Sequence, residues 1–219
     1  MAPKLGYWKI RGLAQPIRLL LEYNGVEFDD FMYVCGPAPD FCKKSWLDEK
    51  FTLGLDFPNL PYYKDGDFSL TQSDTILRYV AESNGMGGTN PKERATLSML
   101  NGTVDDLRWT YLRAVYSSEF EKLKPQLLSD LPNHLNQFDR YLSGRIWLSG
   151  EKVDYPDFNL YDLLDTLKAL EPTCLDNYPR LKKYLTDFEA LPQISAYMKS
   201  PRFMKSPYNN PIAAWGGDV

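Results

Sequence analysis

The chain has 219 residues, of which 43 % are hydrophobic and 25 % are charged, a balance that is typical of soluble globular proteins and excludes an intrinsically disordered chain. This length suits one large domain or two small ones. With 25 lysine and arginine residues against 29 aspartate and glutamate residues, the net charge of -4 gives no general electrostatic reason to bind nucleic acid.

Cysteine and histidine are too few for several common kinds of site. The cysteines Cys35, Cys42 and Cys174 are odd in number and form no CxxC pair, which favours free thiols in a reducing cytoplasm over a secreted disulfide framework. His134 is the only histidine, so we expect no metal site of the usual His and Cys type. No stretch reaches the roughly 20 apolar residues of a membrane span, so we expect no membrane partner.

The first third of the chain alternates strand and helix patterns. Aromatic and branched residues over 4–10 predict a strand that carries Tyr7. Pro16 suits a first helical turn and Asn24-Gly25 a helix end, so a helix is expected between them. Residues 28–34 read as the next strand, which gives a βαβ start.

The stretch that follows predicts a hairpin and a second long helix. We expect, in order, a loop over 35–42, a short helix over 43–51, strands over 62–64 and 68–70, and a helix from 71–74 to 84–85. Asp65-Gly66 is a strong signal for a tight hairpin, so the last two strands should be antiparallel.

The composition changes at residues 85–91, which are rich in glycine, end in proline and are typical of a linker. Strand signals nearly vanish after it, and long helical patterns follow over 92–117, 126–142, 157–170, 179–190 and 193–199. In Asp154-Tyr155-Pro156-Asp157, an N-cap residue, a first-turn proline and an acid at the third helical position predict one helix start.

Several motifs stand in the order found in a known family. They are Leu5-Gly6-Tyr7-Trp8 with Arg11-Gly12-Leu13, residues 54–62 (GLDFPNLPY), Leu70-Thr71-Gln72-Ser73, the loop 35–42, the helix start at 154–157 and residues 195–200 (SAYMKS). Together with the βαβαββα order, they resemble the mu class of cytosolic glutathione transferases over nearly the whole chain.

The resemblance implies a fold of the α/β plus all-α class. A thioredoxin-like βαβαββα domain over 1–84 would bind glutathione, 85–91 would be the linker, and a helical bundle domain over 92–219 would contribute the electrophile site. It also implies a cytoplasmic transferase that uses glutathione as co-substrate and conjugates it to hydrophobic electrophiles in detoxification.

The central chemical requirement is a thiolate. A free thiol with a pKa of about 8.5 is only ~3 % ionised at neutral pH, and a phenol that donates a hydrogen bond to the sulfur favours the anion. A shift of about two units is worth roughly 2.7 kcal/mol. Tyr7 is the candidate donor; the alternative is an aromatic side chain of the core. Trp8 is implied to lie beside the bound peptide, although a core role explains it almost as well.

The ends of glutathione need polar partners, because the tripeptide carries two carboxylates and one ammonium group. Gln72 and Ser73 stand at an expected helix start, where free N–H groups attract a carboxylate, and the resemblance makes them the γ-glutamyl anchor. The resemblance also implies that Asp106 of a second subunit reaches the amine of glutathione. Taken alone, Ser73 is an N-cap and Asp106 a residue of a solvated helix face.

The middle of the peptide is assigned by the resemblance alone. Trp46 and Lys50 match positions that hold the glycine carboxylate, and Lys43 stands where many relatives carry arginine. Leu60-Pro61 matches a cis-proline turn that presents the backbone of Asn59 and Leu60 to the peptide, although this stretch could also be a surface bend.

The second substrate should be an apolar electrophile. Ile10, Leu13 and Tyr116 match positions that form its wall, and Leu13 also borders glutathione. Tyr116 is implied to donate a hydrogen bond to charge that develops on the electrophile, with a core aromatic as the alternative. Arg108 and Asn209 are implied to add polar contacts to this wall.

Phe57 precedes a proline in an exposed-looking loop and resembles the key that inserts into a partner subunit, which implies a two-fold homodimer. The alternative is a ring tucked under its own loop.

Two other functions compete with the transferase. A non-catalytic carrier could use the same cleft for bulky apolar ligands. A thiol–disulfide oxidoreductase fits the thioredoxin-like half, but no cysteine stands at the end of the first strand, where such enzymes keep their nucleophile.

Overall fold

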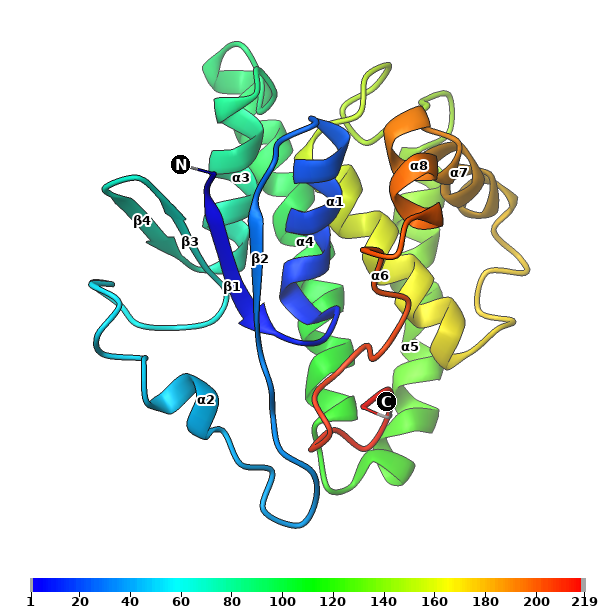
Figure 1. The fold of residues 1–219 in the computed structure, drawn as a ribbon. Coiled ribbons are helices and arrows are strands. Elements are labelled where there is room, and N and C mark those ends of the chain that lie inside the picture. The colour runs from blue at the N-terminus through cyan, green and yellow to red at the C-terminus, as the bar shows by residue number, and fades with distance from the viewer. Residues whose placement is uncertain (1, 218–219) are drawn as a thin grey trace.

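The computed structural model describes residues 2–217 and consists of a half with a β-sheet followed by a helical half (Figure 1). The strands are β1 (Lys4–Trp8), β2 (Asp29–Tyr33), β3 (Tyr62–Asp65) and β4 (Phe68–Thr71), in the sheet order β2-β1-β3-β4. β1 pairs in parallel with β2 and antiparallel with β3, and β3 and β4 form an antiparallel hairpin. The predicted βαβ start and hairpin are confirmed, although the first two strands are shorter than expected.

The helices follow the expected order. In the first half they are α1 (Gln15–Tyr23), α2 (Lys44–Leu47) and α3 (Ser73–Ser83), and in the second half α4 (Pro91–Val115), α5 (Phe120–Tyr141), α6 (Tyr155–Leu170), α7 (Pro179–Glu189) and α8 (Pro192–Lys199). A 3-10 turn over Gly12–Ala14 precedes α1. The fold class, a small α/β half followed by a helical half, is confirmed. Within residues 2–217, no helix is long and apolar enough to cross a lipid bilayer.

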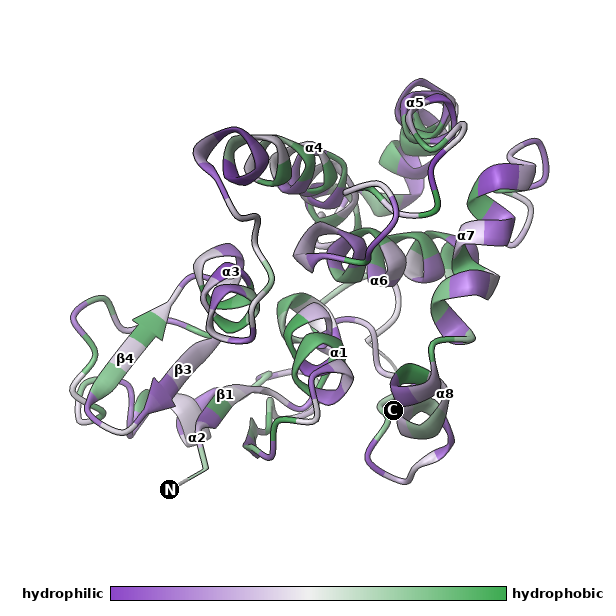
Figure 2. Ribbon diagram, turned by 90° about the horizontal axis from the view of Figure 1, so that it is seen from above, coloured by the Kyte–Doolittle hydropathy of each residue, from purple (hydrophilic) through white to green (hydrophobic). Residues whose placement is uncertain are grey.

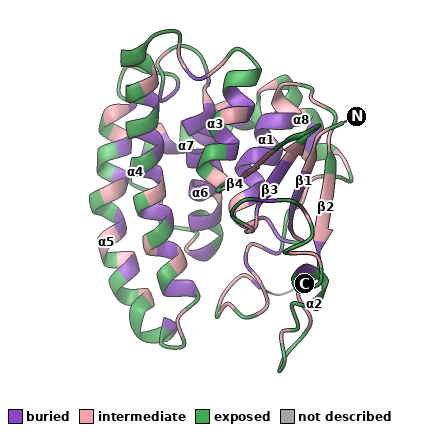
Figure 3. Ribbon diagram, turned by 90° about the vertical axis from the view of Figure 1, so that its left-hand side faces the viewer, coloured by how far each residue is buried: buried purple, intermediate pink, exposed green. Residues whose placement is uncertain are grey.

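The elements form layers that place the two halves in direct contact. Seen from above, α1 and α3 lie between the sheet and the helices α4 and α6 (Figure 2). α6 is buried along nearly its whole length, including its polar residues Asp157, Asn159 and Asp162, whereas α5 exposes one face (Figure 3). The site described below lies where the first half meets α4.

The start of α6 is fixed by its capping box, as predicted. Asp154 accepts a hydrogen bond from the Tyr155 N–H at 2.7 Å, and Asp157 accepts one from the Asp154 N–H at 3.0 Å. Asp157 also accepts from the Leu148 N–H at 2.8 Å and from the Tyr184 hydroxyl at 2.9 Å. The same carboxylate therefore starts the central helix and joins it to α7.

The start of α3 differs from the expectation by one residue. Gln72, with a φ of 74°, is the N-cap, and Ser73 is the first helical residue; neither side chain caps the helix. The interpretation of Ser73 as an N-cap is therefore wrong. The first N–H groups of α3 receive no hydrogen bond from the side chain of the N-cap residue, which leaves them available to a ligand.

Candidate active site

A cavity of about 340 Å³ lies between the segment that follows β1, the C-terminal end of α4 and the C-terminal tail. Its walls are formed by Tyr7, Gly12, Leu13, Trp109, Leu112, Arg113, Tyr116 and Asn209. Four of these residues recur along α4 and its C-cap at the spacing i, i+3, i+4 and i+7, so they share one helix face. The lining is mainly aliphatic and aromatic, which suits an apolar ligand.

Tyr7 brings a hydroxyl group to this cavity from β1. The side chain is only 6 % exposed, and its hydroxyl oxygen accepts a hydrogen bond from the Leu13 N–H at 3.2 Å. Burial raises the pKa of Tyr7 to about 12, against the smaller lowering effect of the Leu13 hydrogen bond. The phenol is therefore protonated at neutral pH. Among residues 2–217 the hydroxyl has no acceptor, so its proton can be donated to a ligand.

Gly12 sets how closely the backbone approaches this hydroxyl. It has a φ of 44°, and a Cβ atom added there would lie 2.7 Å from Tyr7 Oη and 2.8 Å from Tyr7 Cε1. The Gly12 N–H donates to the carbonyl oxygen of Tyr208 at 3.0 Å, which ties the C-terminal tail to the same turn. Only glycine fits both the backbone angle and the contact with the phenol.

Tyr116 provides a second hydroxyl to the same cavity. It is the C-cap of α4 and 41 % exposed, and its hydroxyl oxygen accepts a hydrogen bond from the Asn210 N–H at 2.9 Å. Burial raises the pKa of this hydroxyl, while the contact with Asn210 acts in the opposite direction. Tyr116 is thus also a protonated phenol at neutral pH and can donate a hydrogen bond.

Asn209 lines the cavity, but its amide group holds the tail in place. Its Nδ2 donates to Tyr111 Oη at 2.6 Å and to the carbonyl oxygen of Trp215 at 2.9 Å. Its backbone N–H donates to the carbonyl oxygen of Gly216 at 2.8 Å. The side chain is only 2 % exposed, so it shapes the cavity wall more than it offers free polar groups to a ligand.

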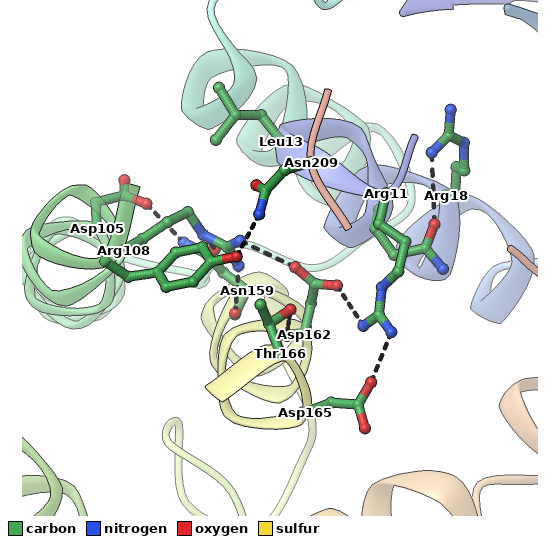
Figure 4. A network of polar contacts seen from close by, with 12 residues as sticks. Arg11, Leu13, Arg18, Asp105, Arg108, Asn159, Asp162, Asp165, Thr166 and Asn209 are labelled. Carbon is green, nitrogen blue, oxygen red and sulfur yellow. Dashed lines mark hydrogen bonds and ion pairs between the residues drawn. The ribbon is translucent and has the colours of Figure 1, made fainter. Parts of the chain in front are cut away.

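Arg108 and Ile10 lie behind the cavity wall and not on it. Arg108 donates from Nε to Asn159 at 3.0 Å and from Nη1 to Asp162 at 2.9 Å, within a buried polar network (Figure 4). Arg11 donates to the other oxygen of Asp162 at 2.8 Å. Ile10 is 3 % exposed and belongs to the hydrophobic core. Of the residues expected at the electrophile wall, the structure brings Leu13, Tyr116 and Asn209 to the cavity.

A narrow cleft at the start of α3 adjoins this cavity through Leu13. Ser73, Asp74, Asp105 and Arg108 are among the residues that line it. Asp106 does not line it, although this residue of α4 is exposed. Ser73 and Leu13 thus meet at this cleft within one chain, whereas Asp106 of the same chain is not part of the cleft.

The residues expected at the glycine end lie around α2, beside a cluster of aromatic rings. Trp46 is 5 % exposed and stacks on Tyr62, with ring centroids 6.3 Å apart. Lys43 is exposed at the N-cap of α2, and the Lys50 Nζ lies 5.3 Å from the ring centroid of Phe51. Neither lysine forms an ion pair with a carboxylate of residues 2–217, so both can meet an anionic ligand.

Trp8 and the turn at Leu60 complete the sites expected from the sequence. Trp8 is partly buried and packs edge-on against Tyr33, with ring centroids 6.3 Å apart. The Leu60-Pro61 bond is cis, as expected. The Leu60 N–H donates to Asn59 Oδ1 at 2.9 Å, so a peptide that binds this N–H must displace the Asn59 side chain.

Comparison with known proteins decides the family. A model described as the glutathione S-transferase N-terminal domain matches residues 3–82, and one described as the C-terminal domain matches residues 105–201. Glutathione S-transferase Mu 3 of Homo sapiens is 48 % identical over 212 residues, which cover 97 % of this chain and 94 % of the relative. Glutathione S-transferase Mu 1 of Bos taurus is also 48 % identical, with 97 % of each chain covered. The chain belongs to the glutathione S-transferase family.

Solved structures agree with this assignment. The glutathione S-transferase Blo t 8 superposes with a TM-score of 0.89 at 34 % identity, covering 97 % of this chain and 99 % of the other. The Pi-class glutathione S-transferase of Onchocerca volvulus gives a TM-score of 0.86 at 32 % identity, covering 97 % and 100 %. The chain is therefore an enzyme of mu-class type, and glutathione is the co-substrate of its family.

Four cavity residues of this transferase were not among those expected from the sequence, namely Gly12, Trp109, Leu112 and Arg113. The last three lie on the same helix face as Tyr116, and this helical spacing is a signal that could have identified them.

Phe57 is 78 % exposed, so the alternative that its own loop covers the ring is wrong.

Proposed function

We propose that this transferase ionises the thiol of glutathione with Tyr7 and joins the sulfur to hydrophobic electrophiles in detoxification. The Tyr7 hydroxyl carries this proposal, because it accepts the Leu13 N–H and keeps its own proton free at the cavity. A hydrogen bond from that proton to the sulfur stabilises the thiolate over the thiol. The three free cysteines fit a reducing compartment, and we propose the cytoplasm.

The electrophile would bind in the apolar part of the cavity. Leu13, Trp109 and Leu112 supply the surface that removes an apolar ligand from water. Tyr116, which lines the same cavity as Tyr7, would donate a hydrogen bond to the negative charge that develops on the electrophile. Ile10 and Arg108 would support this wall from behind.

Glutathione would extend from the cavity along the start of α3 and toward α2. We propose Gln72 and Ser73 as the anchor of the γ-glutamyl carboxylate, because the first N–H groups of α3 attract an anion. Lys43, Trp46 and Lys50 would hold the glycine carboxylate. Asn59 and Leu60 would meet the peptide backbone, and Trp8 would lie beside it.

The working enzyme would be a homodimer. Phe57 would insert into the partner subunit, since an exposed phenylalanine in a loop gains most from being covered. Asp106 would reach the amine of glutathione in the opposite site, because it is exposed and does not line the cleft of its own chain. Asp105 differs, since it accepts a hydrogen bond from Asn159 at 2.9 Å.

The Tyr7→Phe variant tests the mechanism. It should bind glutathione but return the pKa of the bound thiol toward about 8.5, which lowers turnover at neutral pH by about 20-fold. The pKa of the bound thiol is measured from the ultraviolet absorbance of the thiolate, and turnover with a dinitrophenyl halide. Because the pKa of Tyr7 is about 12, the activity of the parent should reach a plateau above the thiol pKa and show no loss from Tyr7 ionisation up to about pH 10.

Equal activity of Tyr7→Phe and the parent at neutral pH would contradict this mechanism. Binding of a fluorescent apolar dye by a parent protein that shows no turnover would instead favour the carrier function.

A further inference from the structure

Arg113 is the one charged residue of the cavity lining within residues 2–217. It lies on α4, and its exposed side chain donates from Nε to the carbonyl oxygen of Trp109 at 3.1 Å. This contact holds the guanidinium group on the helix face that lines the cavity. Among residues 2–217, no carboxylate lies within ion-pair distance of Arg113, so its remaining N–H groups are free to meet a ligand.

The surroundings of Arg113 favour an anion with an apolar body. None of the other lining residues is acidic, and the wall beside Arg113 consists of Trp109 and Leu112. In contrast, the buried arginines of the same region are already paired: Arg11 and Arg108 share Asp162. The positive charge at the cavity is therefore not compensated by nearby protein groups.

We propose that Arg113 selects electrophiles that carry a carboxylate at the end remote from the reacting carbon. This inference rests on the proposed function, which places the sulfur beside Tyr7. A planar guanidinium group can bind a carboxylate with two parallel hydrogen bonds, while the aromatic body of the ligand lies against Trp109 and Leu112. Because Arg113 is exposed, its effect is that of a solvent-screened ion pair, about 2- to 5-fold in affinity.

The test uses two electrophiles of nearly the same shape but different charge, 4-chloro-3-nitrobenzoate and 4-chloro-3-nitrobenzamide, whose difference in intrinsic reactivity cancels when their ratio is compared between variants. Their kcat/KM values are measured with glutathione for the parent, Arg113→Gln and Arg113→Lys. Arg140→Gln is the control for net charge, since Arg140 is exposed near the C-terminal end of α5 and does not line the cavity. Arg140 lies about 30 Å along α5 from Phe120, the first residue of the helix.

The benzoate to benzamide ratio of kcat/KM should fall about threefold in Arg113→Gln, remain nearly unchanged in Arg140→Gln, and recover in part in Arg113→Lys. In the parent this ratio should also fall with added salt, whereas in Arg113→Gln it should not respond. An unchanged ratio in Arg113→Gln would overturn the inference.

A binding measurement separates this inference from the proposed reaction. The unreactive analogues 4-methyl-3-nitrobenzoate and 4-methyl-3-nitrobenzamide quench tryptophan fluorescence, which gives their dissociation constants without turnover. A preference for the benzoate that disappears in Arg113→Gln supports the role of Arg113, even if neither chlorinated compound is turned over and the proposed function is wrong. Equal affinities of the parent for both analogues would overturn the role of Arg113, even where both chlorinated compounds react.

Discussion

At the scale of single residues, the site depends on how closely the backbone at Gly12 approaches the Tyr7 ring. Position 12 carries a left-handed backbone angle, and the space that a Cβ atom would need is occupied by Tyr7 Oη and Ile10 Cδ1. The ring cannot retreat, because Tyr7 is almost fully buried. The glycine therefore permits the position of the hydroxyl that the proposed mechanism requires.

The Gly12→Ala variant should move the Tyr7 hydroxyl. We expect a loss of about 1 to 3 kcal/mol in the free energy of unfolding, from backbone strain and overpacking. We also expect about a threefold loss of turnover at neutral pH, because a displaced phenol stabilises the thiolate less; a loss of this size corresponds to a rise of about one unit in the pKa of the bound thiol from about 6.5. Urea denaturation and the thiolate absorbance measure the two effects.

Gly25→Ala is the matched control, since Gly25 also has a positive φ, of 66°, but a Cβ there meets no atom within 4 Å. It should lose stability through strain alone and keep the parent's turnover. A Gly12→Ala variant whose bound thiol has the same pKa as the parent would show that Tyr7 tolerates the added methyl group.

Some residue roles follow from the sequence and others do not. Local motifs placed Tyr7 and Leu13 at the expected site and the family resemblance placed Tyr116 there, and the cavity includes all three. The sequence alone could not show that Arg108 turns inward while Arg113 lines the cavity. Both are arginines of one helix, and the Asp162 that pairs with Arg108 is 54 positions away in the chain.

At the scale of elements, the start of α6 depends on its capping box, in which Asp157 is the more deeply buried carboxylate. Asp157 is fully buried and accepts hydrogen bonds from two backbone N–H groups and from the Tyr184 hydroxyl. Removal of this acceptor leaves these donors without a partner inside the core, which costs more than the loss of an exposed cap.

Asp157→Ala should therefore lower the free energy of unfolding by about 3 to 5 kcal/mol, measured by urea denaturation. Glu93→Ala is the control, because Glu93 accepts hydrogen bonds from Thr89 at the exposed start of α4. The control should lose less than about 1 kcal/mol. Similar losses in the two variants would mean that water replaces the partners of Asp157.

The elements themselves were largely predictable, because helix starts and hairpin turns are signalled by neighbouring residues. The capping box at Asp154 and the turn at Asp65-Gly66 are examples. α5 is the main exception, since it begins at Phe120 and not at 126. Pro125 lies inside this helix, which extends back to Phe120, whose side chain is buried in the core.

At the scale of the whole molecule, buried ion pairs join the segment after β1 to α4 and α6. Asp162 accepts hydrogen bonds from both Arg11 and Arg108 and is 1 % exposed (Figure 4). Arg11 and Asp162 are 151 positions apart, so no local pattern could have paired them. Because Arg11 immediately precedes Gly12, this network also holds in place the turn at Gly12, whose backbone lies against the Tyr7 ring.

The assembly of two molecules is the remaining requirement of the proposed site. The Phe57→Ala variant should raise the dissociation constant of the dimer by about 30-fold or more, as expected for a central aromatic anchor of an interface. It should leave the folding of each subunit nearly unchanged, because the side chain is 78 % exposed within one chain. Sedimentation equilibrium measures the association, and circular dichroism measures the fold.

Leu123→Ala provides the control, since Leu123 is 39 % exposed on α5 and has no expected role in assembly. A parent protein that stays monomeric at all concentrations would contradict the dimer, and a Phe57→Ala dimer as tight as the parent would contradict the key. If Asp106 completes the opposite site, dilution of Phe57→Ala should lower the affinity for glutathione in step with the loss of dimer. Affinity that does not change with the fraction of dimer would instead mean that each subunit binds glutathione alone.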